Sequence, residues 1–284
     1  MAQTIICNNT GAAPTTIPVL TGPISSYGTI PTVFAVSGML EIDININLTN
    51  KTIYMEQTGN TYIDITNNSI FELNQSHVKA CNTGGFWHKI MIDDAHEKLV
   101  LNETIIEDAE TAVHSENGGW YDIKDSELKN NGTHLLVTNY PTSHLGSVVS
   151  TLFTSQIVGV AAFPVAQNSI DIINVKHITI GDPNSGKNMI LYSNIGIQTR
   201  NSSVDIYNNQ LSKMFPISGV FGGTAIYARG TSAQNNYNPS GHTVRVGAFG
   251  AYMGNMISLS ENGIIAREGI NLEVYHNRIT QNRG

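Results

Sequence analysis

The stretch Lys98–Lys129 contains one short pattern twice and reads Lys-Leu-Val-Leu-Asn-Glu-Thr-Ile-Ile-Glu-Asp-Ala-Glu-Thr-Ala-Val-His-Ser-Glu-Asn-Gly-Gly-Trp-Tyr-Asp-Ile-Lys-Asp-Ser-Glu-Leu-Lys. Its three apolar positions, spaced by two and then five residues, recur 22 residues later: Leu99, Leu101 and Ile106, then Tyr121, Ile123 and Leu128. A spacing of two places both side chains on one face of a strand. The polar residues before the third position indicate a turn, so each copy predicts two short strands.

Further copies of this pattern run along most of the chain. Three more strict copies and two looser ones begin at these residues: Phe71, Val204 and Leu272, then Ile170 (with Ile172 and Ile178) and Val244 (with Val246). A short pair of apolar or small residues precedes four of the strict copies: Met91-Ile92, Ala112-Val113, Gly196-Ile197 and Gly263-Ile264. One unit is therefore three strands in about 22 residues, too short to bury its own apolar face. The repeat predicts an all-β, right-handed parallel β-helix, in which Leu99, Tyr121, Val204 and Leu272 share one interior file.

The composition fits a fold that is half turns. Charged residues make up 13% of the 284 residues, hydrophobic residues 40%, and 31 residues are Asn. Asn and Gly tolerate left-handed backbone at turns, and stacked Asn side chains can hydrogen-bond along a column. Disorder is the alternative for an Asn-rich chain, but the regular Ile, Val and Leu positions argue against it.

The repeat favours one elongated domain with an irregular beginning. Residues 1–38 carry several prolines and predict an N-terminal cap over the first open strand edge, with a linker from a lost upstream domain as the alternative. Residues 39–284 are predicted to form the β-helix, and we expect the natural polypeptide to continue beyond residue 284 or the chain to be truncated. Three segments read as insertions that emerge from turns: 138–168, 181–194 and 229–242.

Charge and cysteine content exclude several classes of partner. A net charge of −7 without a basic run argues against nucleic acid and anionic membrane surfaces. No apolar run approaches the ~18 residues needed to span a bilayer.

Residues 1–7 show no signal peptide, which leaves a cytosolic location or a removed signal. Cys7 and Cys81 could pair or stay free, and they are too few to define a disulfide framework or metal site.

The segment that contains Ala80-Cys81, Trp87 and Ile106-Glu107-Asp108-Ala109 resembles a family of large secreted right-handed β-helix proteins of Bacteroidetes. Many of those proteins end in a type IX secretion sorting domain. The close resemblance covers residues 76–137, and a general likeness to pectate-lyase-like β-helices covers 40–284. Lys89 stands where the family usually has Gly, and no sorting domain is present. The resemblance implies the fold and a secreted or cell-surface location, and it implies no particular chemistry.

The position between the first two apolar residues of each copy points outward and is mostly acidic: Glu72, Val100, Asp122, Asp171, Asp205, Arg245 and Glu273. Adjacent parallel strands lie ~4.8 Å apart, so stacked carboxylates repel, raise one another's pKa or hold a cation. Oxygen ligands on one sheet are also how pectate-lyase-like β-helices bind Ca²⁺ against an acidic polysaccharide. This predicts Ca²⁺ at Asp171 and Asp205, catalysis by these two residues with Arg245 as base, and binding at Glu72, Asp122 and Glu273. A charge ladder without function is the alternative.

Other candidate residues have simpler alternatives. Trp87 and Trp120 precede strands and could stack on sugar rings, or fill the ends of a turn of the solenoid. His88, His114 and His134 lie in successive strands at unequal offsets, so we do not expect a stacked metal site. Asp93-Asp94 resembles the paired aspartates of polygalacturonases, but the partner motifs are missing and a turn is the better interpretation.

Two functions from different classes follow. The first is a secreted or cell-surface structural and binding module for a polysaccharide or a surface protein, and the second is a Ca²⁺-dependent polysaccharide lyase or glycoside hydrolase. A compact cluster of carboxylates with Arg, Lys or His would favour the enzyme. A third interpretation, part of an attachment fibre, requires a trimer, and the sequence does not indicate the oligomeric state.

Overall fold

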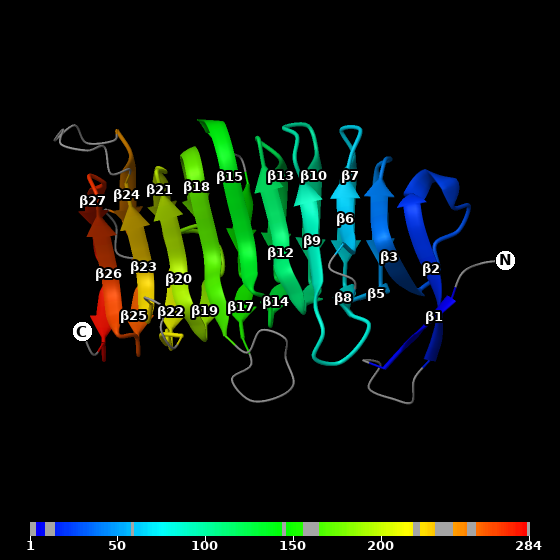
Figure 1. Ribbon diagram of the computed structural model, residues 1–284. Helices are drawn as coiled ribbons and strands as arrows, with labels where there is room; N and C mark the ends of the chain where they lie inside the picture. The colour runs from blue at the N-terminus through cyan, green and yellow to red at the C-terminus, as the bar shows by residue number, and fades with distance from the viewer. Residues whose placement is uncertain are drawn as a thin grey trace.

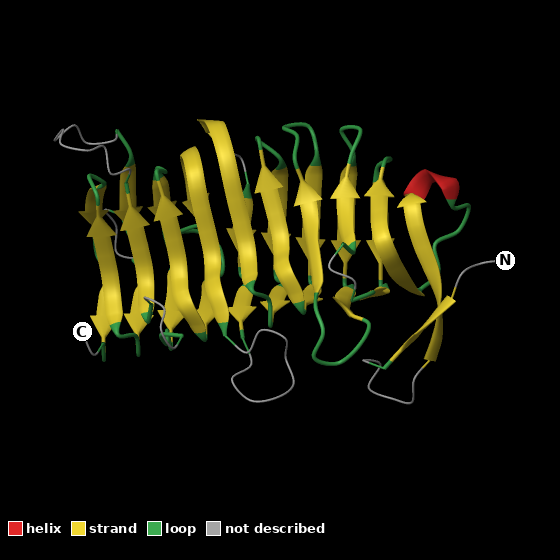
Figure 2. Ribbon diagram, in the orientation of Figure 1, coloured by secondary structure: helices red, strands yellow, loops and turns green. Residues whose placement is uncertain are grey.

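The computed structural model describes residues 4–8, 15–57, 60–143, 146–155, 165–217, 222–230, 241–248 and 254–282. The protein is a right-handed parallel β-helix of about eight turns (Figure 1). Each turn contributes three short strands, and successive turns stack in parallel. In the described residues, helix is limited to η1 (Ile24–Ser26) near the N-terminus, as Figure 2 shows. The predicted all-β solenoid is confirmed.

The strands form three long sheets, which we name in the order in which the chain visits them. The first sheet contains β4 (Ile46–Thr49), β7 (Ile70–Asn74), β10 (Lys98–Asn102), β13 (Trp120–Lys124), β16 (Ser147–Val149), the end of β18 (Ala166–Ile180), β21 (Val204–Ile206), β24 (Thr243–Val246) and β27 (Asn271–Val274). The second contains β5 (Thr52–Met55), β8 (His77–Ala80), β11 (Ile105–Glu107), β14 (Glu127–Lys129), β17 (Leu152–Thr154), β19 (Asn188–Leu191), β22 (Asn209–Ser212), β25 (Met256–Ser258) and β28 (Arg278–Thr280). The third contains β6 (Tyr62–Ile65), β9 (Trp87–Ile92), β12 (Ala109–Glu116), β15 (Thr133–Ser143), the beginning of β18, β20 (Ser193–Arg200), β23 (Thr224–Arg229) and β26 (Asn262–Arg267).

The core is built from inward files that cross the strands. Leu99 pairs in register with Tyr121, and further along the same side Val204 connects through Val244 to Leu272. The first four of these side chains are buried, and Leu272 is partly buried against the same core. The hydrogen-bonded ladder of the first sheet has two parts, β4 to β16 and β18 to β27, so the predicted file exists as two segments.

The N-terminal segment joins the solenoid through strand pairing and a disulfide. β1 (Thr4–Cys7) lies antiparallel to β2 (Thr15–Pro23), and β2 pairs in parallel with β3 (Val33–Ile42). Parallel pairing therefore begins at Val19, upstream of residue 39. Cys7 and Cys81 form a disulfide, which settles the alternative that the sequence left open.

The chain turns at most corners through one residue with positive φ. Between the first and second sheets these residues have φ of 48° to 55°: Asn50, Gln75, Glu103, Asp125, Ser150, Asn208 and His276. The corner between the second and third sheets uses Asp108, Asn130, Tyr192, Lys213, Leu259 and Gln281, and the corner between the third and first uses Asn117, Asn139, Asn174, Asn201 and Glu268. Asn is frequent because it adopts the left-handed conformation at lower cost than most residues.

A buried asparagine ladder runs along the corner between the first and second sheets. Asn188 Nδ2 donates to Asn209 Oδ1 at 2.9 Å, Asn209 Nδ2 to Asn255 Oδ1 at 3.0 Å, and Asn255 Nδ2 to Asn277 Oδ1 at 2.9 Å. Towards the N-terminus, smaller hydroxyl side chains take this position: Ser76, Thr104, Ser126 and Thr151. The ladder satisfies polar groups that would otherwise be buried without partners, and it confirms the expected stacking of Asn.

The copy predicted at Ile170 has the wrong phase. Ile170 and Ile172 lie in the third sheet, where they pair with Leu135 and Val137. The apolar pair of the first sheet in this turn is instead Ile178 and Ile180, beside Val204 and Ile206. Because β18 runs around a corner without a break, one strand supplies both pairs, and spacing alone does not separate them.

Candidate functional site

The outward row predicted on the first sheet exists in two parts. Glu72, Val100 and Asp122 lie side by side on β7, β10 and β13, and Ser147 extends this part on β16. Further along, Asp205, Arg245 and Glu273 lie side by side on β21, β24 and β27. Glu72 accepts a hydrogen bond from Asn74 at 2.8 Å, and Lys98 Nζ lies 4.0 Å from Asp122.

Asp171 does not belong to this row, because of the phase error at Ile170. It lies on the third sheet between Leu136 and Gln198, and Thr179 takes its place beside Asp205. The prediction that Asp171 and Asp205 stand in one outward row is therefore wrong, because the two carboxylates lie on different sheets. Asp171 instead accepts hydrogen bonds from Asn168, Gln198 and Arg200, and burial raises its pKa although Arg200 lies 3.0 Å away.

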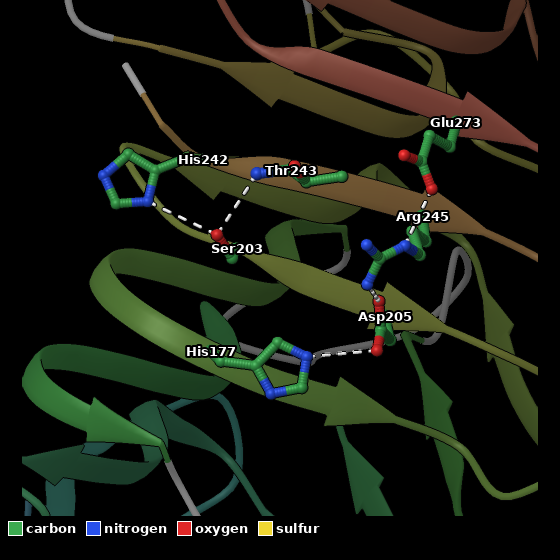
Figure 3. A network of polar contacts seen from close by, with 7 residues as sticks. All are labelled: His177, Ser203, Asp205, His242, Thr243, Arg245 and Glu273. Carbon is green, nitrogen blue, oxygen red and sulfur yellow. Dashed lines mark hydrogen bonds and ion pairs between the residues drawn. The ribbon is translucent and has the colours of Figure 1, made fainter. Parts of the chain in front are cut away.

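The second part of the row is the centre of a polar network on four consecutive strands, β18, β21, β24 and β27 (Figure 3). Arg245 Nε donates to Glu273 Oε2 at 2.7 Å, and Arg245 Nη1 lies 3.4 Å from Asp205 Oδ1. The other carboxylate oxygen of Asp205 lies 3.0 Å from His177 Nε2. Arg245 thus occupies the position between two carboxylates that a bound cation would otherwise take.

Four further residues lie beside this network. Burial, with a smaller effect of the Asp205 carboxylate, raises the pKa of Tyr207 to about 12, so its phenol stays protonated and can donate. Ser203 Oγ accepts a hydrogen bond from the backbone N–H of Thr243 at 3.1 Å and lies 3.5 Å from His242 Nδ1. Burial lowers the pKa of His242, which favours a neutral imidazole at this edge.

The network is open to solvent on its outer side. The side chains of Arg245 and His177 are 43% and 39% exposed, whereas that of Asp205 is 13% exposed. Ion pairs of this kind stabilise a fold by only about 0–1 kcal/mol each. The network therefore contributes little to the stability of the fold, and its side chains are accessible from the outer face of the sheet.

A pocket of about 230 Å³ adjoins the network through Tyr207. Residues of β16, the end of β18 and the following turn line it: Gly146, Ser147, Val148, Val149, Thr179, Gly181, Asp182 and Pro183. Asp182 accepts hydrogen bonds from the backbone of Asn184 and the hydroxyl of Ser185, both at 2.8 Å, which hold the turn in shape. Tyr207 therefore lines a small pocket next to the network.

A second pocket, of about 360 Å³, lies at the corner between the second and third sheets. Its lining combines aromatic, apolar and charged side chains: Tyr192, Lys213, Met214, Phe215, Leu259, Ser260, Glu261 and Gln281. Lys213 Nζ lies 4.6 Å from the centre of the Tyr192 ring. Phe215 and Leu259 are more than 40% exposed, so one wall of this pocket is apolar and accessible.

The two tryptophans have different environments. Trp87 is fully buried and donates its indole N–H to the carbonyl of Glu107 at 2.8 Å, so it is a core residue and does not bind a sugar. Trp120 is 37% exposed at the start of β13, beside Lys98 on the outer face of the first sheet. Only the second tryptophan remains a binding candidate.

The remaining candidates are the three histidines of successive strands and the Asp93-Asp94 pair. No group of three or more His, Cys, Asp or Glu side chains in the described residues has a metal-binding arrangement. Burial lowers the pKa of His114 to about 4 and that of His134 to about 3. Asp93 and Asp94 lie in a turn whose backbone N–H groups donate to Glu97, as the sequence suggested.

The repeat pattern in the sequence did not identify His177 and Tyr207 as site residues. His177 directly precedes Ile178, so it would have been found if the copy had been placed at Ile178. Tyr207 directly follows Ile206 in a strict copy and was overlooked because only the position between the apolar residues was considered.

Comparison with known proteins identifies no relative, since no family model, curated protein or solved structure matches the chain. In the described part of the chain, no helix has the length and apolarity that a membrane-spanning segment needs.

Proposed function

We propose that this β-helix is a secreted or cell-surface module that binds a glycan on the outer face of its first sheet. The observation that carries the proposal is the contact of Asp205 with Arg245 and His177, with Tyr207 beside it, on an accessible sheet. Aromatic side chains pack against the apolar face of a sugar ring, and carboxylate, guanidinium and imidazole groups hydrogen-bond its hydroxyls. Trp120 and Asp122 provide an aromatic ring and a carboxylate further along the sheet.

One observation supports an extracellular location. Disulfides persist mainly in oxidising compartments, and Cys7 and Cys81 are paired. Oxidised and reduced Cys7 peptides from the native source, separated by mass spectrometry, would test this location.

A glycan array with the labelled full chain, followed by calorimetric titration of the best ligand, tests the binding function. Asp205→Asn and Tyr207→Ala are each expected to weaken binding about tenfold, the effect of one lost hydrogen bond to a charged group or one lost stacking contact. Glu110→Gln is the matched control, because it removes one carboxylate from the exposed side of the third sheet. Equal loss in the control, or no glycan bound, would contradict the proposal, and a surface protein would then be the alternative partner.

A polysaccharide lyase or glycoside hydrolase is the second candidate. The joint presence of Arg245, His177 and two carboxylates favours it, because a lyase needs a cation for the uronate and a base for the proton. Incubation with uronate polysaccharides should then produce ultraviolet absorbance from unsaturated ends, and His177→Ala should abolish it while binding persists. Production of new reducing ends without that absorbance would indicate a hydrolase, and an unchanged polymer would exclude both.

A further inference from the structure

Three arginines occupy the same register position on consecutive strands of the third sheet. Arg200 on β20 pairs with Arg229 on β23, and Arg229 pairs with Arg267 on β26. Each ends a short repeated motif: Gly196-Ile197-Gln198-Thr199-Arg200, Ala225-Ile226-Tyr227-Ala228-Arg229 and Gly263-Ile264-Ile265-Ala266-Arg267. Neighbouring like charges are unfavourable, and Arg200 and Arg229 are held by ion pairs with Asp171 and Glu268. This column of three arginines makes the end of the third sheet that is formed by β20, β23 and β26 basic.

The same column is acidic at the opposite end of the sheet. Glu116 lies in register with Thr138, and Thr138 with Ile173, which is the neighbour of Arg200. Asp93 follows Ile92, the partner of Ser115, and therefore lies beside Glu116. Asp64 and Glu41 add two carboxylates in the adjacent column, and burial with the charges of Asp93 and Glu41 raises the pKa of Asp64 to about 6. Lys89 is a cation near this end, 3.3 Å from His114.

The middle of the sheet exposes apolar side chains. Leu136 on β15 and Ile173 on β18 point outward and are partly exposed, between polar neighbours Thr138 and Asp171. Figure 1 shows β12, β15, β18 and β20 side by side, with no described element crossing their outer face. The third sheet is therefore acidic at one end, apolar in the middle and basic at the other.

We propose that this face binds a second copy of the chain in a two-fold symmetric dimer. The two-fold axis would run parallel to the strands, midway between β15 and β18. Rotation about this axis reverses the order of the strands, so each column of one copy faces the same column of the second copy. Counting strands outward from that axis places Glu116 opposite Arg200 of the second copy and Asp93 opposite Arg229 of the second copy. Thr138 then lies against Ile173 at the centre. A two-fold interface must be complementary to itself, and this column meets that condition at the two charge pairs, with the uncharged Thr138 and Ile173 at the axis.

The available area is sufficient for a reversible dimer. Eight strands, β6 to β26, form the face, and at ~4.8 Å per strand and ~3.3 Å per residue over about five residues they cover about 600 Å². Two copies would bury about 1,200 Å², the lower limit for specific complexes. This interface lies on a different sheet from the proposed glycan site, so the two proposals fail independently.

Sedimentation equilibrium of the full chain tests the dimer. The wild type is expected to dimerise reversibly and to dissociate in about 1 M salt, which screens the charge pairs. Arg229→Glu and Asp93→Arg should each weaken the dimer at least tenfold, because each places like charges opposite one another. The double variant D93R/R229E restores opposite charges across the axis and should regain most of the affinity.

Arg278→Glu is the matched control, since it makes the same charge change on the second sheet. Circular dichroism and thermal unfolding of every variant establish that the fold is retained. A wild type that stays monomeric at about 1 mM, a double variant no better than its parents, or an equal effect of the control would overturn the proposal. If Arg229→Glu alone abolished binding of dextran sulfate and the protein stayed monomeric, the arginines would form an anion site instead.

Discussion

Cys7 and Cys81 form a disulfide across 74 residues of sequence and attach β1 to the end of β8 in the second sheet. In the same place, the backbone N–H of Asn8 donates to the carbonyl of Cys81 at 3.1 Å, and the Asn8 side chain accepts from the N–H of Thr83 at 2.9 Å. The disulfide therefore closes a large loop around β2 to β8.

Removing this disulfide should destabilise the N-terminal end selectively. Closing a loop of this length is worth about 4 kcal/mol in the unfolded chain, and repeat proteins lose structure locally. Hydrogen exchange in Cys7→Ser/Cys81→Ser should be faster in β1 and β2 and unchanged in β20 to β26. Uniform acceleration along the whole chain would contradict this account.

The buried asparagine ladder should contribute strongly to stability. Asn209 is fully buried and bonds to Asn188, Asn255 and the carbonyls of Ile180 and Tyr207. Asn209→Ala leaves several of these groups without partners, so we expect a loss of about 2–4 kcal/mol in the free energy of unfolding, measured with urea. Asn74→Ala, which removes hydrogen bonds on the exposed first sheet, should cost less than about 1 kcal/mol. Similar losses in both variants would refute the special role of the ladder.

Gly247 should not tolerate a side chain. Its φ is +78°, and a Cβ there would lie 1.9 Å from the carbonyl oxygen of Tyr275 on the next turn. We expect Gly247→Ala to lower the free energy of unfolding by more than about 2 kcal/mol. Gly269 has a similar φ of +69° with no atom within 4 Å, so Gly269→Ala should show the backbone cost alone, about 1 kcal/mol.

Glu97 should make stability fall as pH rises. Its carboxylate accepts two backbone N–H bonds, but burial dominates and raises its pKa from 4.5 to about 7. Between these values the folded state binds more protons than the unfolded state, so stability decreases with pH through this range. Glu97→Gln keeps the acceptor and removes the titration, so its unfolding free energy should change less than that of the wild type between about pH 5 and about pH 8. An identical pH dependence in both proteins would contradict the shift.

Much of the fold follows from local chemistry in the sequence. The spacing of Leu99 and Leu101 sets the inward face of a strand, and the copy at Tyr121 sets the height of one turn, because side chains alternate along any strand. The many Asn residues mark corners, since a left-handed turn is a property of one residue and its neighbours. The row Asp205, Arg245 and Glu273 was found in this way.

Some contacts between residues on neighbouring strands could not be predicted, because the number of residues between these strands differs from turn to turn. Asp205 and Arg245 are 40 residues apart and Arg200 and Arg229 are 29 apart, because the turns carry insertions of unequal length, and counting residues therefore does not give the register. For the same reason the arginine column was missed. Asp171 was placed on the wrong sheet, and His177 was missed, because β18 runs around a corner and supplies two apolar pairs. The Cys7–Cys81 disulfide likewise became evident only in three dimensions. Strand faces and turns are determined by neighbouring residues, whereas contacts between turns of the solenoid are determined by the stacking of the whole chain.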